Sequence, residues 1–201
     1  MTVFISGGAK CGKSSFAQNL AVALAGGGKR YYVATMIPTG EEDYARIRRH
    51  ISDRDGMGFE TVECFNDIMA IAKTHGTFLV DSETSLVQNS LFPVDKNYEM
   101  DLNGANRCAD ALIQFAHTVR HAVFVSDYIY SDAGRYSEST EMYRKCLADI
   151  DRRLAAVCDT VIEVSAGQLI IHKSCHCEEQ SDMAIPIDIG DCHTSVCTGS
   201  Q

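Results

Sequence analysis

The sequence of 201 residues predicts an α/β fold in which helices cover both faces of a mostly parallel sheet. Short runs of β-branched and aromatic residues alternate with longer segments of helical period, and several of the runs are apolar throughout. This alternation is typical of doubly wound domains. The expected strands are 2–6, 31–35, 59–64, 78–81, 122–126 and 160–165, with 167–172 as a candidate seventh. The expected helices are 14–25, 41–53, 66–74, 105–120 and 139–157, and residues 92–104 are expected to form a polar surface loop.

The charge balance narrows the class of partner. With 27 acidic and 18 basic residues the net charge is -9, which argues against nucleic acid or an anionic membrane as the main partner. We see neither a membrane-spanning apolar stretch nor an export signal. We therefore expect a cytoplasmic protein whose nine cysteines are reduced thiols.

The first motif with chemical meaning follows the first expected strand. The segment GGAKCGKS satisfies the phosphate-loop pattern G-x-x-x-x-G-K-[ST], with a buried strand before it and an amphipathic helix after it. An ordinary glycine-rich turn would not need both flanks. Lys13 is expected to reach the β- and γ-phosphates of ATP or GTP, and the Ser14 hydroxyl to bind Mg²⁺. The loop residues are Gly7, Gly8, Ala9, Lys10, Cys11, Gly12, Lys13 and Ser14. With this loop, the fold class is that of the P-loop NTPases (RecA-like).

A P-loop enzyme also needs a carboxylate at the end of a neighbouring strand to hold the metal. Asp81 follows the run FLV, and Asp127 follows VFVS. The residues alone favour Asp81 slightly, because no polar residue separates it from its apolar run. Either aspartate could instead cap the helix that follows its strand.

Residues 41–50 form an expected helix with acidic residues first and basic residues last, the order that suits the helix dipole. Glu42 and Arg46 make an i,i+4 pair. On spacing alone His50 is a solvated cation of the last turn. The alternative makes His50 a nucleophile toward a nucleotide α-phosphate, with Arg46, Arg49 and Arg54 neutralising the developing charge.

These pieces together resemble the bifunctional adenosylcobinamide kinase/adenosylcobinamide-phosphate guanylyltransferase family of cobalamin biosynthesis. Its motifs GGxRSGKS, I-A-T-A, D-E-M-x-x-R-I-x-x-H-x-x-x-R, W-x-T-x-E and V-D-C-L-T-x-x-x-x-N appear in order. The matching segments are GGAKCGKSS (7–15), VATM (33–36), EEDYARIRRHISDR (41–54), FETVE (59–63) and VDSET (80–84) with Asn89. A late RLAA (153–156) and Lys173 extend the resemblance to residues 1–173, which we expect to form a single domain.

The resemblance implies two reactions on one fold. A nucleoside triphosphate, ATP or GTP, phosphorylates the hydroxyl of adenosylcobinamide with the help of Lys13, and His50 carries GMP from GTP to the phosphorylated product. Mg²⁺ would be held by Ser14 and Asp81, and the protein would be a homo-oligomer. Besides the phosphate loop, the implied nucleotide contacts are Ala34, Thr35, Met36, Ile51, Ser52, Asp53, Arg54, Glu63 and Asp81.

This chain departs from the family's pattern on the acceptor side. The family's S-N-E-V-G-x-G-I-V-P is replaced by residues beginning SDYIYSDA (126–133), and its late G-R-x-N-Q by ADIDR (148–152). In the phosphate loop, Lys10 replaces an arginine and so loses bidentate geometry. Two other functions stay open at this point: a P-loop kinase of another small molecule, or a non-catalytic GTP-binding regulator.

The last segment, 174–201, has neither helical nor strand period, and we expect a poorly ordered tail. It carries six closely spaced cysteine and histidine residues, but not as paired C-x-x-C motifs. A zinc site and an accidental extension are both compatible with that spacing, and the spacing favours the second.

Overall fold

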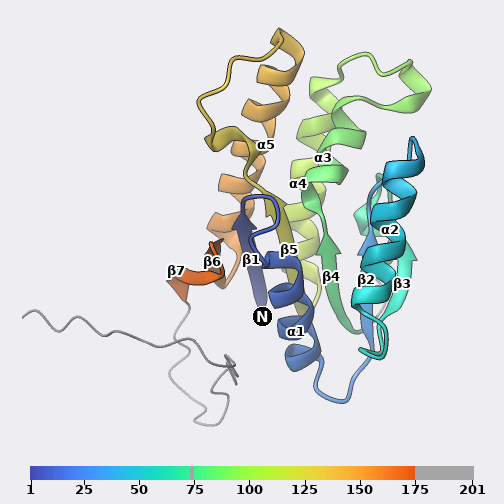
Figure 1. The fold of residues 1–201 in the computed structure, drawn as a ribbon, viewed down its shortest axis with the longest axis vertical. Coiled ribbons are helices and arrows are strands. Elements are labelled where there is room, and N and C mark those ends of the chain that lie inside the picture. The colour runs from blue at the N-terminus through green and yellow to red at the C-terminus, as the bar shows by residue number, and fades with distance from the viewer. Residues whose placement is uncertain (73–74, 175–201) are drawn as a thin grey trace, which may run out of the picture.

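The computed structural model describes residues 1–72 and 75–174, which form one seven-stranded sheet in the order β3-β2-β4-β5-β1-β6-β7 (Figure 1). Neighbouring strands from β3 to β6 run parallel, and only the edge strand β7 is antiparallel to its neighbour. The strands are β1 (Thr2–Gly7), β2 (Arg30–Ala34), β3 (Glu60–Glu63), β4 (Thr77–Asp81), β5 (His121–Asp127), β6 (Thr160–Ser165) and β7 (Gln168–Ser174). All seven expected strands are therefore present.

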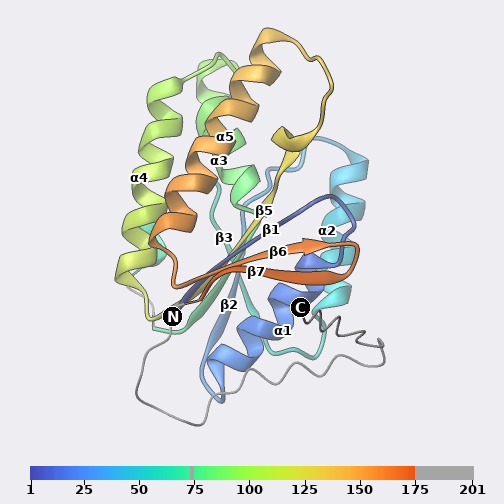
Figure 2. The same ribbon diagram turned by 90° about the vertical axis from the view of Figure 1, so that its left-hand side faces the viewer.

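Two apolar cores, one on each face, hold the layers together. Side chains alternate between the faces of a strand, so Tyr31 joins one core and Tyr32 the other. Helix α1 (Lys13–Ala25) covers one face, with α2 (Glu41–Asp53) on the same side (Figure 2). Helices α3 (Glu83–Leu91), α4 (Leu102–Thr118) and α5 (Glu138–Val157) cover the other. The predicted fold class is confirmed.

Two expectations about helices were wrong. The predicted helix 66–74 is only the short 3-10 turn η1 (Ile68–Ile71) among its described residues, and α4 begins at Leu102, inside the loop expected for 92–104. Asp101 explains this early start, because its carboxylate accepts a hydrogen bond from the Gly104 N–H at 2.9 Å and so caps the helix. The same stretch holds another 3-10 turn, η2 (Val94–Lys96).

Helix α3 was not predicted at all. Its sequence ETSLVQNSL is rich in residues of modest helix propensity, so the local signal is weak. It forms because Leu86, Val87 and Leu91 are completely buried in the core under α4. Of the predicted tail, only Ser174 falls within the described residues, where it ends β7; the Cys/His segment lies outside them.

The topology brings several chain segments to one edge of the sheet. The carboxyl ends of β1, β2, β4 and β5 lie side by side, because these strands are parallel and adjacent. Gly7, Ala34, Asp81 and Asp127 end these four strands. Ligands of open α/β sheets bind at this edge. Within the described residues, no helix combines the length and apolar character that crossing a membrane requires.

Candidate active site

The phosphate loop joins β1 to α1 and depends on two glycines. Gly12 has φ +96° at the N-cap of α1, a conformation that L side chains rarely adopt. A Cβ on Gly7 would lie 2.6 Å from the carbonyl oxygen of Val164, so no larger residue fits there. The loop therefore presents its N–H groups and the positive end of the α1 dipole to one space.

That space is a cavity of about 960 Å³, which we call the phosphate cavity. Lys13 is almost completely buried at its base. Its ammonium donates a hydrogen bond to the carbonyl of Gly8 at 3.0 Å and forms an ion pair with Asp127. The lining residues come from the loop and the start of α1, from α2, from the end of β5 and from the segment after β5: Gly7–Ser15, Glu42, Asp43, Ala45, Arg46, Arg49, His50, Asp127, Tyr128, Ile129, Ser131 and Asp132.

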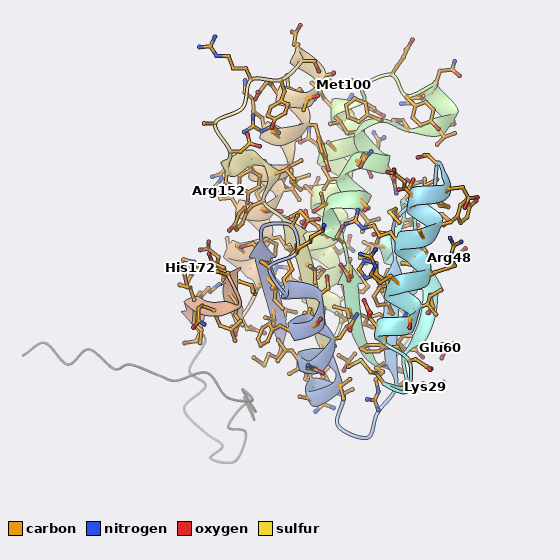
Figure 3. The ribbon with its side chains drawn as sticks, viewed as in Figure 1. Lys29, Arg48, Glu60, Met100, Arg152 and His172 are labelled. Atoms are coloured by element: carbon orange, nitrogen blue, oxygen red, sulfur yellow. The ribbon has the colours of Figure 1, made fainter. Side chains whose placement is uncertain are left out.

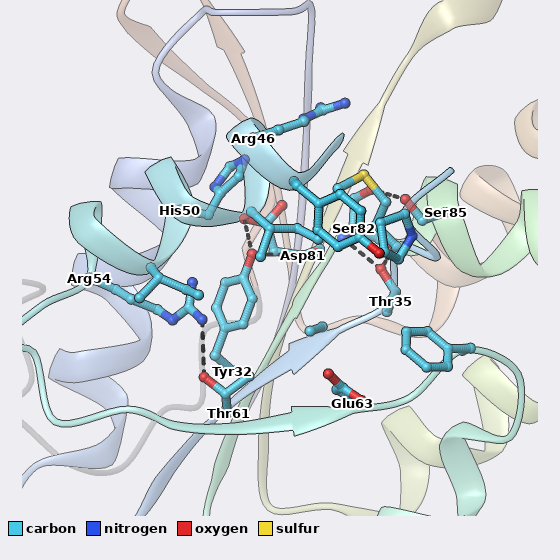
Figure 4. Close-up of a pocket in the computed structure, with 17 residues that line it drawn as sticks. Tyr32, Thr35, Arg46, His50, Arg54, Thr61, Glu63, Asp81, Ser82 and Ser85 are labelled. Atoms are coloured by element: carbon cyan, nitrogen blue, oxygen red, sulfur yellow. Dashed lines mark hydrogen bonds between the residues drawn. The ribbon is translucent and has the colours of Figure 1, made fainter. Parts of the chain in front are cut away.

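A second cavity, of about 260 Å³, lies beside it between α2 and the ends of β2, β3 and β4 (Figure 4). We call it the base cavity. It is partly aromatic and carries two carboxylates, Glu63 on β3 and Asp81 at the end of β4. The lining residues are Tyr32, Ala34, Thr35, Met36, Pro38, Tyr44, Arg46, Ile47, His50, Ile51, Arg54, Thr61, Glu63, Phe65, Asp81, Ser82 and Ser85.

Helix α2 separates the two cavities. It has no buried residue, and two of its side chains, Arg46 and His50, line both cavities. Arg48 of the same helix lies on the outer side of the molecule (Figure 3). The Nδ1 atom of His50 is buried and has no hydrogen-bond partner among the described residues. His50 therefore keeps a ring nitrogen that no neighbouring group engages, at the boundary between the two cavities.

The base cavity has a layered wall. The guanidinium of Arg54 stacks on the Tyr32 ring, 3.9 Å from its centre, and donates to the hydroxyl of Thr61 at 3.0 Å. The Tyr32 hydroxyl donates to the Asp81 carboxylate at 3.3 Å. Burial raises the pKa of Asp81, and the nearby charge of His50 opposes that rise. Arg54, Tyr32 and Asp81 thus form one chain of contacts, and the His50 ring lies near its Asp81 end (Figure 4).

The ends of β2 and β4 are tied together behind this wall. The Thr35 hydroxyl donates to the Ser82 carbonyl at 2.7 Å and accepts from the Ser82 N–H at 3.0 Å. The amide of Asn89, on α3, donates to the carbonyls of Thr35 and Phe65 at 2.8 and 2.9 Å. Asn89, a position of the family motif, therefore acts here by holding the chain that shapes the base cavity.

Comparison with known proteins agrees with this arrangement of loop, helix and strand ends. The family model for cobinamide kinase / cobinamide phosphate guanyltransferase matches residues 3–171. The chain belongs to this family. This is a family of cobalamin biosynthesis, and the match covers β2 to β6 completely, together with most of β1 and the first part of β7.

Other comparisons are more distant. The ATPase domain of G40P is similar over 87% of this chain and 77% of its own, at 12% identity and a TM-score of 0.49. The flagellar accessory protein FlaH from Methanocaldococcus jannaschii is similar over 86% and 78%, at 15% identity and a TM-score of 0.42. No protein of curated function matches the chain. The fold class rests on the sheet topology and the phosphate loop, not on these scores.

The structure brings most of the expected site residues together. The whole phosphate loop lines the phosphate cavity, and seven further expected nucleotide contacts line the base cavity. Two others, Ser52 and Asp53, line neither of these cavities. The seven are Ala34, Thr35, Met36, Ile51, Arg54, Glu63 and Asp81.

Sequence reasoning missed Tyr32 and the ion pair of Asp127 with Lys13, although Asp127 itself was one of the two carboxylates considered for the metal. Tyr32 supports Arg54 and Asp81, but it looks like any aromatic residue of a buried strand in the sequence. The pairing of Asp127 with Lys13 depends on β5 lying directly beside β1, which no local pattern specifies. The strand order is the signal that would have found it.

The donor set fits a magnesium ion. Mg²⁺ prefers oxygen ligands and binds through one or two protein groups plus substrate phosphates. Ser14 offers a hydroxyl in the phosphate cavity. Asp81 offers a carboxylate on which the charge of Lys13 acts, but it lines the base cavity and not the phosphate cavity. Among the described residues there is no cluster of three or more metal-binding side chains, so no all-protein cage is present.

Proposed function

We propose that this protein phosphorylates the hydroxyl of the aminopropanol arm of adenosylcobinamide and then transfers GMP from GTP to the resulting phosphate through His50. The observation that supports this most directly is the position of His50 and Arg46, which line both the base cavity and the phosphate cavity. A nucleotide whose base fills one cavity and whose terminal phosphates fill the other has its α-phosphate at this boundary.

In the guanylyl transfer, the base of GTP occupies the base cavity, where the Glu63 carboxylate accepts hydrogen bonds from the donor edge of guanine. A ring nitrogen of His50 attacks the α-phosphorus. The bond from that phosphorus to the bridging oxygen breaks, and pyrophosphate leaves. A phosphate oxygen of the acceptor then attacks the same phosphorus and releases His50. Arg46 and Arg49, both in the wall of the phosphate cavity, stabilise the added negative charge.

In the kinase reaction, Lys13 and the loop N–H groups hold the triphosphate of ATP or GTP. Ser14 and Asp81 would hold Mg²⁺, which supplies neutralisation of phosphate charge when bound. The family resemblance also suggests a homo-oligomer, which sedimentation velocity on the purified protein can test.

Incubation with GTP labelled with ³²P at the α-phosphate tests the covalent step. We expect an acid-labile label on the protein that is released as product when adenosylcobinamide phosphate is added. His50→Ala should abolish the label, whereas His117→Ala, at an exposed position on α4, should keep it. A folded, GTP-binding protein without label would contradict the proposal and favour a kinase of another molecule or a non-catalytic regulator.

A further inference from the structure

Two carboxylates end two neighbouring parallel strands at the site, and a P-loop enzyme needs only one of them for its metal. Asp81 ends β4 and Asp127 ends β5, which lies between β4 and the phosphate-loop strand β1. Asp127 is in register with Gly7, the first residue of the loop. Of the two, Asp127 is therefore the carboxylate directly beside the phosphate loop.

The environments of the two carboxylates differ. Asp81 lines the base cavity, accepts a hydrogen bond from Tyr32 and feels the charge of His50. Asp127 lines the phosphate cavity and pairs with Lys13, and 23% of its side chain is exposed. Its backbone N–H donates to the Thr84 hydroxyl at 2.9 Å, which fixes the residue at the end of β5. Asp127 thus faces the space where the terminal phosphate of a bound triphosphate lies.

Lys13 cannot keep its present partners when a triphosphate binds. Its ammonium now contacts the Asp127 carboxylate and the Gly8 carbonyl. A phosphate-loop lysine turns to the β- and γ-phosphates of a bound nucleotide. That movement leaves an oxygen of Asp127 available next to the γ-phosphate. Tyr128, Ile129 and Ser131, which follow in the chain, continue the cavity wall on the same side.

We propose that Asp127 is the general base of the phosphoryl transfer in this chain, a role that rests on the proposed kinase function. The family's motif has Asn-Glu at positions 127 and 128, whereas this chain has Asp-Tyr, so the carboxylate of this segment stands one position earlier here. The Asp127 carboxylate accepts the proton of the acceptor hydroxyl as that oxygen forms its bond to the γ-phosphorus. The bond between the γ-phosphorus and the β,γ-bridging oxygen breaks, and the nucleoside diphosphate leaves with the electron pair. The proton passes from Asp127 to solvent after release of the phosphate ester. His50 needs no such base, because an imidazole nitrogen attacks with its own lone pair.

The variant Asp127→Asn removes the base and keeps the shape of the side chain. With γ-³²P-labelled ATP and adenosylcobinamide, we expect kcat for phosphate transfer to fall about 10²- to 10⁴-fold. ATP affinity, measured by calorimetry, should stay within about threefold, since the change removes no phosphate contact. Labelling of His50 by α-labelled GTP should persist. Asp149→Asn, the same change on the surface of α5, should leave all three measurements unaltered.

Three results would overturn this role for Asp127. One is a kcat within about threefold of the wild type, well short of the loss expected for a general base. Another is a parallel loss of ATP binding and His50 labelling, which would make Asp127 a structural partner of Lys13. The third is recovery of activity at high Mg²⁺, the behaviour expected of a metal ligand and of Asp81→Asn. If the wild type itself transfers no phosphate, the proposed kinase function fails and this role fails with it.

Discussion

The base cavity and the segment 127–136, here called the acceptor wall, keep the family's pattern to different degrees. Residues 127–129, 131 and 132 of this segment line the phosphate cavity. Around the base cavity, Thr35, Glu63 and Asp81 stand at motif positions and make the contacts that shape it. The acceptor wall carries tyrosines and aspartates where the family's motif has glycines and an Asn-Glu pair. The base-cavity side of His50 thus keeps residues of the family's motif, whereas the acceptor wall replaces them.

The departures from the motif meet in space. Glu83 stands where the motif has leucine, Tyr130 where it has glycine and Asp151 where it has asparagine. The Tyr130 hydroxyl donates to Asp151 at 2.8 Å, and the Ser126 hydroxyl lies 2.8 and 3.0 Å from the two oxygens of the same carboxylate. Glu83 is fully buried beside it. Because a buried carboxyl group needs donors, a change at one of these positions requires changes at the others.

The acceptor wall is also held by one buried cation. Arg144, on α5, donates to the backbone carbonyls of Ile129, Tyr130, Asp132 and Gly134 at 2.8–3.3 Å. The Tyr136 ring packs over its guanidinium, 4.9 Å away. These hydrogen bonds hold the backbone of residues 129–134 against α5. The base cavity is thus lined largely by residues at motif positions, whereas the acceptor wall is held by contacts between distant parts of the chain.

Among the variants that test this comparison, the largest effect is expected for Glu63→Gln, on the affinity for GTP. Glu63→Gln replaces the charged acceptor proposed for the guanine N–H groups by a neutral amide. Hydrogen bonds to charged groups contribute about 1.5–3 kcal/mol. GTP affinity should fall roughly 10- to 100-fold with little change for ATP, measured by calorimetry. Glu60→Gln, also on β3 but outside the base cavity, is the control (Figure 3). Equal losses of affinity for GTP and ATP would show that Glu63 does not distinguish guanine from adenine.

A smaller effect, on the other side of His50, is expected from Arg144→Lys. A lysine keeps the charge but cannot reach four carbonyls, so the acceptor wall loosens. We expect KM for adenosylcobinamide to rise about fivefold, the equivalent of one hydrogen bond of about 1 kcal/mol. Labelling of His50 by GTP should be unchanged. A parallel loss of labelling would show that the wall also shapes the nucleotide side.

Glu83→Gln should leave both reactions unchanged and alter only stability. Burial, and next the neighbouring Asp151, raise the pKa of Glu83 well above 4.5. Above pH 4.5 the unfolded chain loses this proton and the folded chain keeps it. The free energy of unfolding therefore falls by about 1.4 kcal/mol per pH unit until the folded pKa is reached.

Glutamine has no proton to lose, so the variant should lose less stability with rising pH. Urea unfolding from pH 5 to 8 measures this, with Glu99→Gln, at an exposed position, as the control. Identical pH profiles for Glu83→Gln and the wild type would mean that Glu83 is ionised in the folded protein.

Local patterns predicted the strands, the phosphate loop and α2 because each depends on residues close in sequence. They did not predict α3, which is stabilised by burial of Leu86 and Val87 and not by its own propensity. Most residues at the motif positions line one of the two cavities, whereas Ser52 and Asp53 line neither; their contact with a nucleotide stays a prediction. The ion pair of Lys13 with Asp127 and the burial of Glu83 near Asp151 join segments far apart in sequence, so they required the strand order and the packing of α5.

The most direct test of the account is a crystal structure with a non-hydrolysable GTP analogue. We predict the guanine in the base cavity against Glu63, the terminal phosphates on the loop before Lys13, and the α-phosphorus about 3–3.5 Å from a ring nitrogen of His50. A base bound outside the base cavity, or a His50 ring turned away from the α-phosphate, would contradict the central claim that His50 acts between the two cavities.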